Sequence, residues 1–227
     1  MNKFTYYVCS IHTKNLTQTC EDAKRQRFLF FLCVLASLRL CVKIFLKNMK
    51  PEIISAETIY KGRVFDVSIA EIREGETEYK REIVSHKGSA VIVPVFADET
   101  VGLVRQYRHA AQKYLLEIPA GSLETDENPE IGARRELEEE IGVTAGNFEK
   151  LIEFYVSPGF LTEKMHVFLA TDLTETEQNL EADELIEIEK ISFERAFEKI
   201  RNGEIEDGKT IVGLILAGAK FGVLFKS

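Results

Sequence analysis

The sequence predicts a mixed α/β (α+β) fold, in which three β-rich stretches precede a core of strands and helices. Apolar residues recur with the period of strands, one charged segment carries helix caps at both ends, and two helical segments close the chain. The 227 residues are 45% apolar and 10% aromatic, which is ordinary for a globular protein. We therefore expect one mixed domain with an N-terminal appendage.

The first 48 residues differ from the rest. They hold eight Lys or Arg and two acids, a charge of +6, so residues 49–227 carry −8 − 6 = −14. The stretch 28–46 is apolar, but Arg39 and Lys43 interrupt it and leave less than the ~20 residues that span a bilayer. We favour a disordered extension or a start codon assigned upstream of Met49. The alternative is a membrane-anchor-like segment at 28–46.

Charge and cysteine use bound the function. A net charge of −8 argues against a protein that binds nucleic acid through a broad basic surface. All four cysteines lie in residues 1–48, so residues 49–227 need neither disulfides nor thiolate chemistry. We expect a cytoplasmic protein without a membrane partner.

The strands are expected in this order. Residues 49–88 predict an N-terminal antiparallel β subdomain, and residues 89–227 predict the main domain. The subdomain's strands are expected at 53–60, 63–73 and 78–86, from alternating apolar residues between turn signals. The continuous apolar run at 89–97 predicts a central strand, and 101–107 is expected to pair with it as a hairpin. Later strands are expected at 148–156, 165–170 and 186–191.

Helices complete the expected order. Asn128 as N-cap, Pro129 at the first helical position and Gly142 after the last turn predict a helix over 129–141. Two further helices are expected at 193–201 and 209–225.

The capped helix belongs to the motif GSLETDENPEIGARRELEEEIGV, residues 121–143. Positions three and four apart share a helix face, so Glu136, Glu139 and Glu140 would repel one another without a cation between them. Clustered carboxylates suit Mg²⁺, and Mn²⁺ as a substitute. Arg135 stands where it can orient a carboxylate. The alternative is a solvated, salt-bridged helix face, which the flanking glycines, Glu127 and the register disfavour.

This motif resembles the Nudix box at every specified position. The resemblance implies a Nudix fold, a mixed β-sheet sandwiched between helices, whose box helix holds divalent metals at a diphosphate. It implies Glu136 and Glu140 as metal ligands, with Glu139 as a third or water-mediated ligand.

Two further patterns resemble the ADP-ribose pyrophosphatase branch. In LEIPAG, residues 116–121, that branch uses the backbone carbonyl at Ala120 as a metal ligand. In Ser157-Pro158-Gly159, Pro158 stands sixteen residues after Gly142. The implied reaction is hydrolysis of ADP-ribose to AMP and ribose 5-phosphate. The alternatives are another nucleotide-sugar pyrophosphatase, acting on GDP-mannose or ADP-glucose, and a non-catalytic nucleotide-binding Nudix protein.

The same resemblance implies the remaining site residues. The substrate-binding residues are Arg81, Glu82, Arg108, Glu117 and Pro158. The catalytic residues are Glu184, Glu181, Glu139 and Arg135. Glu184, in the acidic loop 174–185, is the first choice for the catalytic base and a further metal ligand; Glu181 is second and Glu163 third. The branch also implies a homodimer whose N-terminal strands complete the partner's adenine pocket. A solvated acidic loop and a surface strand charge are the alternatives for the glutamates and for the arginines.

Overall fold

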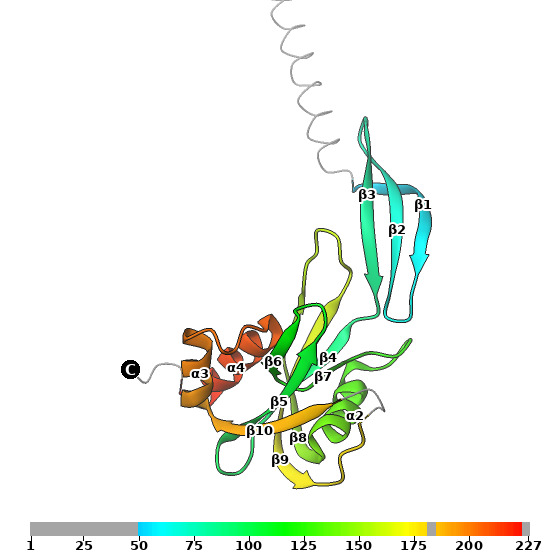
Figure 1. Cartoon of the computed structure of the whole chain (residues 1–227). Helices are drawn as coiled ribbons and strands as arrows, with labels where there is room; N and C mark the ends of the chain where they lie inside the picture. The colour runs from blue at the N-terminus through cyan, green and yellow to red at the C-terminus, as the bar shows by residue number, and fades with distance from the viewer. Residues whose placement is uncertain (1–49, 181–184, 224–227) are drawn as a thin grey trace, which may run out of the picture. The chain divides into compact units, whose positions relative to one another are not determined.

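The computed structural model describes residues 50–180 and 185–223 (Figure 1). The strands are β1 (Glu52–Lys61), β2 (Phe65–Glu74), β3 (Thr77–His86), β4 (Ser89–Pro94), β5 (Thr100–Arg108), β6 (Lys113–Glu117), β7 (Ala120–Ser122), β8 (Val143–Tyr155), β9 (Lys164–Glu175) and β10 (Ile186–Ser192). The helices are α2 (Pro129–Ile141), α3 (Phe193–Arg201) and α4 (Gly208–Lys220). Within the described residues the chain divides into two compact units, one of residues 50–55 and 71–80, the other of residues 56–70, 81–180 and 185–223.

In the part of the chain that the structure describes, the strands form three sheets, in the orders β1-β2-β3, β10-β5-β6 and β7-β4-β9-β8. In the third sheet β4 pairs parallel with β9 and antiparallel with β7, so this sheet is mixed. In the second, β5 pairs antiparallel with both β10 and β6. The predicted mixed sheet is confirmed.

Helices cover both faces of the mixed sheet, and β4 shows why. Successive side chains of a strand point to opposite faces. Val91 and Val93 join a core cluster with Phe193 and Leu214 of α3 and α4. The intervening Ala90 and Ile92 join a second cluster that includes Ala133 and Leu137 of α2. All six residues of β4 are buried, which explains its continuous apolar sequence. The predicted sandwich of a sheet between helices is confirmed.

The predicted helix over 129–141 is confirmed with its caps. The Asn128 side chain accepts a hydrogen bond from the Glu130 N–H at 2.9 Å, and Pro129 occupies the first position. Gly142 takes the left-handed conformation at φ 68°, and its N–H donates to the carbonyl of Glu138. Glycine adopts this conformation without the steric cost that a Cβ imposes.

Several expectations for the other elements are wrong. The predicted hairpin between 89–97 and 101–107 is not formed, because β4 and β5 lie in different sheets and share an isolated bridge, Val95 to Val101. Each strand has a buried apolar segment because each is central in its own sheet, so composition alone did not identify their partners. The short strands β6 and β7 were not predicted. The last helix ends at Lys220 and not at 225, since Gly222 takes φ 68°. Strands β8 and β9 are longer than expected.

Some expectations fall outside the described residues. These are the segment 28–46 and the loop residues Glu181, Asp183 and Glu184. Within residues 50–180 and 185–223, no helix is long and apolar enough to cross a membrane.

Candidate functional site

The acidic face of α2 meets the backbone of β7. Glu136 and Glu140 are buried, with exposures of 8% and 3%, and Glu139 is half-buried. The Ala120 N–H donates a hydrogen bond to Glu140 Oε2 at 3.0 Å. A Cβ added at Gly121 would overlap the carboxyl group of Glu136. Gly121 therefore leaves the space that the Glu136 carboxylate occupies, and two acids of α2 touch two consecutive residues of β7.

Arg135 gathers three carboxylates around its guanidinium. It donates to Glu127 at 3.3 Å, to Glu136 at 2.7 Å and to Glu139 at 2.9 Å. Burial raises the pKa of Glu127, but the hydrogen bonds from Arg135 and from the backbone lower it by more. The pKa of Glu127 therefore lies below its usual value. The pKa of Arg135 is raised despite its burial, by Glu127 and Glu136. This guanidinium holds the three carboxylates close together.

The donor set fits a divalent cation in its chemistry. Hard cations take carboxylate and carbonyl oxygens. The carboxylates of Glu136 and Glu140 lie against the backbone of Ala120 and Gly121. In the described part of the chain, no three acidic, His or Cys side chains already stand as a complete metal-binding group. Arg135 instead neutralises part of the acidic charge.

A cationic cavity of about 390 Å³ lies beside this cradle. Its wall includes residues 120–122 and three basic residues, Arg63, Arg108 and Lys209. Cations that face one cavity suit an anionic ligand such as a diphosphate. A place for a cation and a place for an anion are therefore adjacent.

Glu117, at the end of β6, anchors two of these cations. It is 1% exposed and accepts a bidentate pair of hydrogen bonds from Arg108, from Nε and from Nη2, each at 2.8 Å. Lys209 also donates to Glu117. Burial raises the pKa of Glu117, but the Arg108 hydrogen bonds and the Lys209 charge lower it more, and the net shift is downward. Glu117 stays ionised inside the protein.

Glu163 is the acidic side chain in the wall of this cavity. Its Oε1 accepts a hydrogen bond from the Ser89 hydroxyl at 2.6 Å and lies 3.8 Å from Nδ1 of His86. These partners come from β3 and β4, and Glu163 immediately precedes β9. The glutamate ranked third as the catalytic base thus lies at the cavity.

The other expected substrate residues lie elsewhere. Arg81 and Glu82 are exposed on β3, Pro158 is exposed after β8, and none of the three lines the cationic cavity. Arg108 does line it, and Glu117 lies behind Arg108. The acidic loop begins close to α2, since Gln178 Nε2 donates to the Glu140 carbonyl at 2.6 Å. Glu181 and Glu184 follow, outside the described residues.

Sequence reasoning missed Arg63, Ser89 and Lys209 as cavity residues. A signal for Lys209 does exist in the sequence. It follows Asp207, the N-cap of α4, and so places a cation at the positive end of a helix dipole. A cation there needs compensating anions, and Glu117 and Asp207 provide them.

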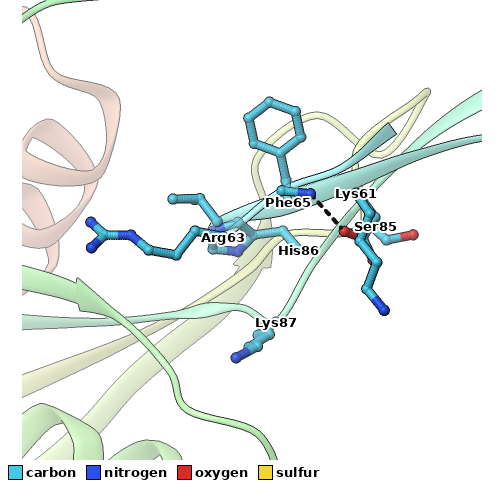
Figure 2. A pocket seen from close by; sticks show the side chains of 9 residues that line it. Lys61, Arg63, Phe65, Ser85, His86 and Lys87 are labelled. Atoms are coloured by element: carbon cyan, nitrogen blue, oxygen red, sulfur yellow. Dashed lines mark hydrogen bonds between the residues drawn. The ribbon is translucent and has the colours of Figure 1, made fainter. Parts of the chain in front are cut away.

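A second cavity of about 360 Å³ lies at the turn between β1 and β2 and at the end of β3. Figure 2 shows Lys61, Arg63 and Phe65 from that turn together with Ser85, His86 and Lys87. The Phe65 side chain is exposed, although it pairs with Tyr60 at a centroid distance of 5.7 Å.

Comparison with known proteins agrees with this geometry. A model of the NUDIX domain matches residues 86–212, more than half of the chain. The chain belongs to the Nudix family. This Nudix protein is 38% identical to a protein named ADP-ribose pyrophosphatase from Bacillus subtilis (strain 168), over 73% of the chain and 91% of the relative.

Other relatives carry different names. The "Methanol dehydrogenase activator" of Bacillus methanolicus is 36% identical, over 74% of the chain and 92% of the relative. A GDP-mannose pyrophosphatase of Salmonella typhimurium is 38% identical, over 62% of the chain and 78% of the relative. A solved structure titled "Crystal structure of ADP compounds hydrolase" aligns with a TM-score of 0.68 at 21% identity, covering 78% of this chain and 98% of that one. This likeness confirms the Nudix fold.

Proposed function

We propose that this Nudix protein hydrolyses ADP-ribose to AMP and ribose 5-phosphate with Mg²⁺ as its divalent cation. Mn²⁺ can substitute for Mg²⁺. The observation that carries the proposal is the adjacency of the acidic cradle on α2 and the cationic cavity beside β7. A diphosphate needs both, because metal ions and fixed cations share its negative charge. The 38% identity to a protein named ADP-ribose pyrophosphatase supports the substrate.

The residues of α2 and β7 would hold the cation. Glu136 and Glu140 supply carboxylate oxygens, Ala120 its carbonyl, and Glu139 a third or water-mediated contact. When bound, such a cation polarises phosphorus, lowers the pKa of water and stabilises the leaving phosphate. Arg135 orients Glu136 and Glu139 through its hydrogen bonds.

Arg108 would bind the diphosphate from the wall of the cationic cavity. Its guanidinium is partly exposed in the cavity while Glu117 holds two of its N–H groups. A planar guanidinium fixed in this way presents its remaining donors to phosphate oxygens. Arg81, Glu82 and Pro158 are proposed contacts for the rest of the nucleotide sugar.

The reaction adds one water across the diphosphate. Water oxygen forms a bond to one phosphorus, the bond from that phosphorus to the bridging oxygen breaks, and the water proton goes to a carboxylate base. Glu184 is the proposed base and a further metal contact, with Glu181 second. Glu163 is third, and its support is its place in the wall of the cavity.

We also propose a homodimer formed through the N-terminal strands. All ten residues of β1 are exposed, and they include Ile53, Ile54 and Ile59. An exposed edge with apolar side chains is typical of a surface that pairs with another chain. Phe65, Lys61 and Lys87 in Figure 2 suit a nucleotide base and its phosphates, which supports their use in the partner's site. Light scattering on the eluted peak of a sizing column tests the mass.

Product analysis tests the reaction. The full chain is incubated with Mg²⁺ and, separately, ADP-ribose, ADP-glucose and GDP-mannose, and the products are separated by ion exchange. We expect AMP and ribose 5-phosphate from ADP-ribose, no turnover in EDTA, and recovery with Mg²⁺ or Mn²⁺. Preference for GDP-mannose would favour the second candidate function, a GDP-mannose pyrophosphatase, which the Salmonella relative supports. No turnover of any substrate would favour a nucleotide-binding protein.

The compartment is a separate proposal. Residues 49–227 contain no cysteine, which suits the reducing cytoplasm. Fractionation of cells with an antibody to the main domain tests this, and recovery with membranes would contradict it.

A further inference from the structure

We propose that Lys209 is a positioning residue, which fixes the guanidinium of Arg108 in the cationic cavity by sharing the buried carboxylate of Glu117 with it. This inference rests on the proposed function, because it assigns Arg108 to the diphosphate. It concerns a lysine on α4, far in sequence from the motif over 121–143.

The shared carboxylate is the first step. Arg108 Nε and Nη2 each lie 2.8 Å from one oxygen of Glu117, so both oxygens are engaged by one planar fork. Lys209 Nζ donates to Oε2, the oxygen that also accepts from Arg108 Nη2. The Glu117 side chain is 2% exposed, that of Lys209 9% and that of Arg108 38%. Both cations line the cavity, but the lysine is almost wholly buried against the carboxylate and the arginine is the more exposed of the two.

The second step is what holds Lys209. Asp207 Oδ2 lies 3.0 Å from the Lys209 ammonium. Asp207 is also the N-cap of α4, and Oδ2 accepts from the Thr210 N–H at 2.9 Å and from its hydroxyl at 2.5 Å. The Thr210 hydroxyl oxygen accepts in turn from the Ile118 N–H at 2.9 Å. The first turn of α4 is thus fastened to the residue that follows Glu117.

The third step is charge. Glu117 and Asp207 together balance Arg108 and Lys209, so no member of the group is buried as an unpaired ion. The pKa of Arg108 is raised, first by its hydrogen bonds to Glu117 and further by the charges of Glu140 and Asp207. Removing Lys209 leaves Arg108 as the remaining cation of the pair on the buried Glu117 carboxylate. The carboxylate is then no longer held in place from two directions. The guanidinium then binds diphosphate oxygens with less pre-ordering.

The fourth step separates positioning from stability. Lys220 lies at the other end of the same helix, in an exposed ion pair with Glu149. Lys220→Met is therefore a matched control, since it removes a paired lysine of α4 that does not contact the cavity. Lys209→Arg restores the charge and tests rescue.

The experiment is a double-mutant cycle on the full chain, read as kcat, KM and thermal midpoint. We expect Lys209→Met to raise KM by about 10-fold, within the range typical of residues that orient a binding group, and to change kcat by less than about 3-fold. In the Arg108→Ala background, Lys209→Met should add almost nothing to KM, because its effect passes through Arg108. Lys209→Arg should recover most of the affinity, and Lys220→Met should leave KM unchanged.

Two outcomes would overturn the inference. Additive effects on KM in the cycle would mean that Lys209 contacts the substrate independently of Arg108. An unchanged KM in a folded Lys209→Met variant would mean that Arg108 needs no second cation. If Lys209→Met does not fold, Asp207→Asn replaces it, because Asn keeps the N-cap and removes the charge that holds Lys209. It should raise KM in the wild-type background and not in Arg108→Ala.

The same cycle is read as affinity for inorganic pyrophosphate by calorimetry in EDTA. This readout is independent of turnover, so the two proposals can fail separately. Failure of the wild-type chain to hydrolyse ADP-ribose would refute the proposed reaction. Pyrophosphate binding that responds to Lys209 and Arg108 additively would refute the coupling.

Discussion

The Glu136 carboxylate lies in the space that a Cβ at residue 121 would occupy, so Gly121 is the residue that leaves room for it. The φ of Gly121 is not positive, so its backbone alone does not require glycine. The glycine of this motif is needed for the carboxylate that lies against it. Since that carboxylate is the end of a flexible side chain, it can be displaced without disrupting the fold.

Gly121→Ala should therefore remove activity while the protein stays folded. Displacement of Glu136 takes away one proposed metal ligand, and we expect kcat/KM to fall by about 100-fold, equivalent to ~2.7 kcal/mol. The thermal midpoint should fall by only a few degrees, as for a loss of about 1 kcal/mol. Gly208→Ala is the control, since nothing lies within 4 Å of its added Cβ. Equal activity of the two variants would contradict this account.

Glu140→Gln tests the second ligand without changing its size. The amide oxygen can still accept the hydrogen bond that the Ala120 N–H gives to Glu140, so the local structure should persist. The negative charge is lost, and we expect kcat to fall by about 10³-fold because a metal site contributes several kcal/mol to the transition state. Calorimetry should show weaker Mg²⁺ binding. Retention of both turnover and Mg²⁺ affinity would remove Glu140 from the ligand set.

The sequence predicted the parts of this protein that depend on local rules. The α2 helix followed from Asn128, Pro129 and Gly142, whose effects act over one turn. The approach of β7 to the acidic face of α2 was expected through the resemblance, in which Ala120 shares a metal with Glu136 and Glu140. The three residues of β7 are too few for a periodic pattern from which the contact between Glu136 and Gly121 could be derived. The partners of β4 and β5 were mispredicted for a related reason. The buried part of a strand is apolar whichever neighbours it pairs with, as in all of β4 and in residues 101–104 of β5.

Long-range ion pairs were hidden in the same way. Glu117 and Lys209 are 92 positions apart, and neither belongs to a repeated or periodic pattern. Their meeting depends on the packing of α4 onto the mixed sheet, where Gly213 lies against Ile118 and Val93. Only the placement of a lysine at a helix N-terminus signalled that an anion had to be near.

Stability should depend on pH through Glu117. Its folded pKa is lowered from 4.5, so the unfolded chain binds more protons between the folded pKa and 4.5. The stabilisation is therefore complete above about pH 5 and is lost as pH falls through the folded value. Wild type should melt above Glu117→Gln at pH 6.5, and the difference should shrink below pH 4.5.

Other titrating groups cancel in that comparison. Glu127 also has a lowered pKa, and His166 a pKa lowered by burial, but both are present in the two proteins. A difference in melting temperature that stays constant from pH 6.5 to pH 3.5 would show that Glu117 does not contribute through its ionisation.

Substitution of Gly142, the C-cap of α2, should destabilise the protein more than substitution of Gly203. Its φ of 68° disfavours any side chain, and an added Cβ would lie 3.1 Å from the Gln178 backbone nitrogen and 3.2 Å from the Thr176 carbonyl oxygen. Gly203 has a similar φ of 79° and nothing within 4 Å, so Gly203→Ala measures the backbone cost alone. That cost is about 1–2 kcal/mol for a left-handed L-residue.

In urea unfolding, Gly142→Ala should lower the free energy of unfolding by about 1 kcal/mol or more beyond the loss in Gly203→Ala. The reason is that the backbone atoms near residue 142 cannot move aside as a flexible side chain does. It should also lower kcat, since Thr176 and Gln178 hold the start of the acidic loop against α2 through hydrogen bonds to the carbonyls of Gly142 and Glu140. Gly203→Ala should leave kcat unchanged. Equal unfolding free energies together with unchanged turnover in Gly142→Ala would show that the close approach of this loop to α2 matters neither for stability nor for catalysis.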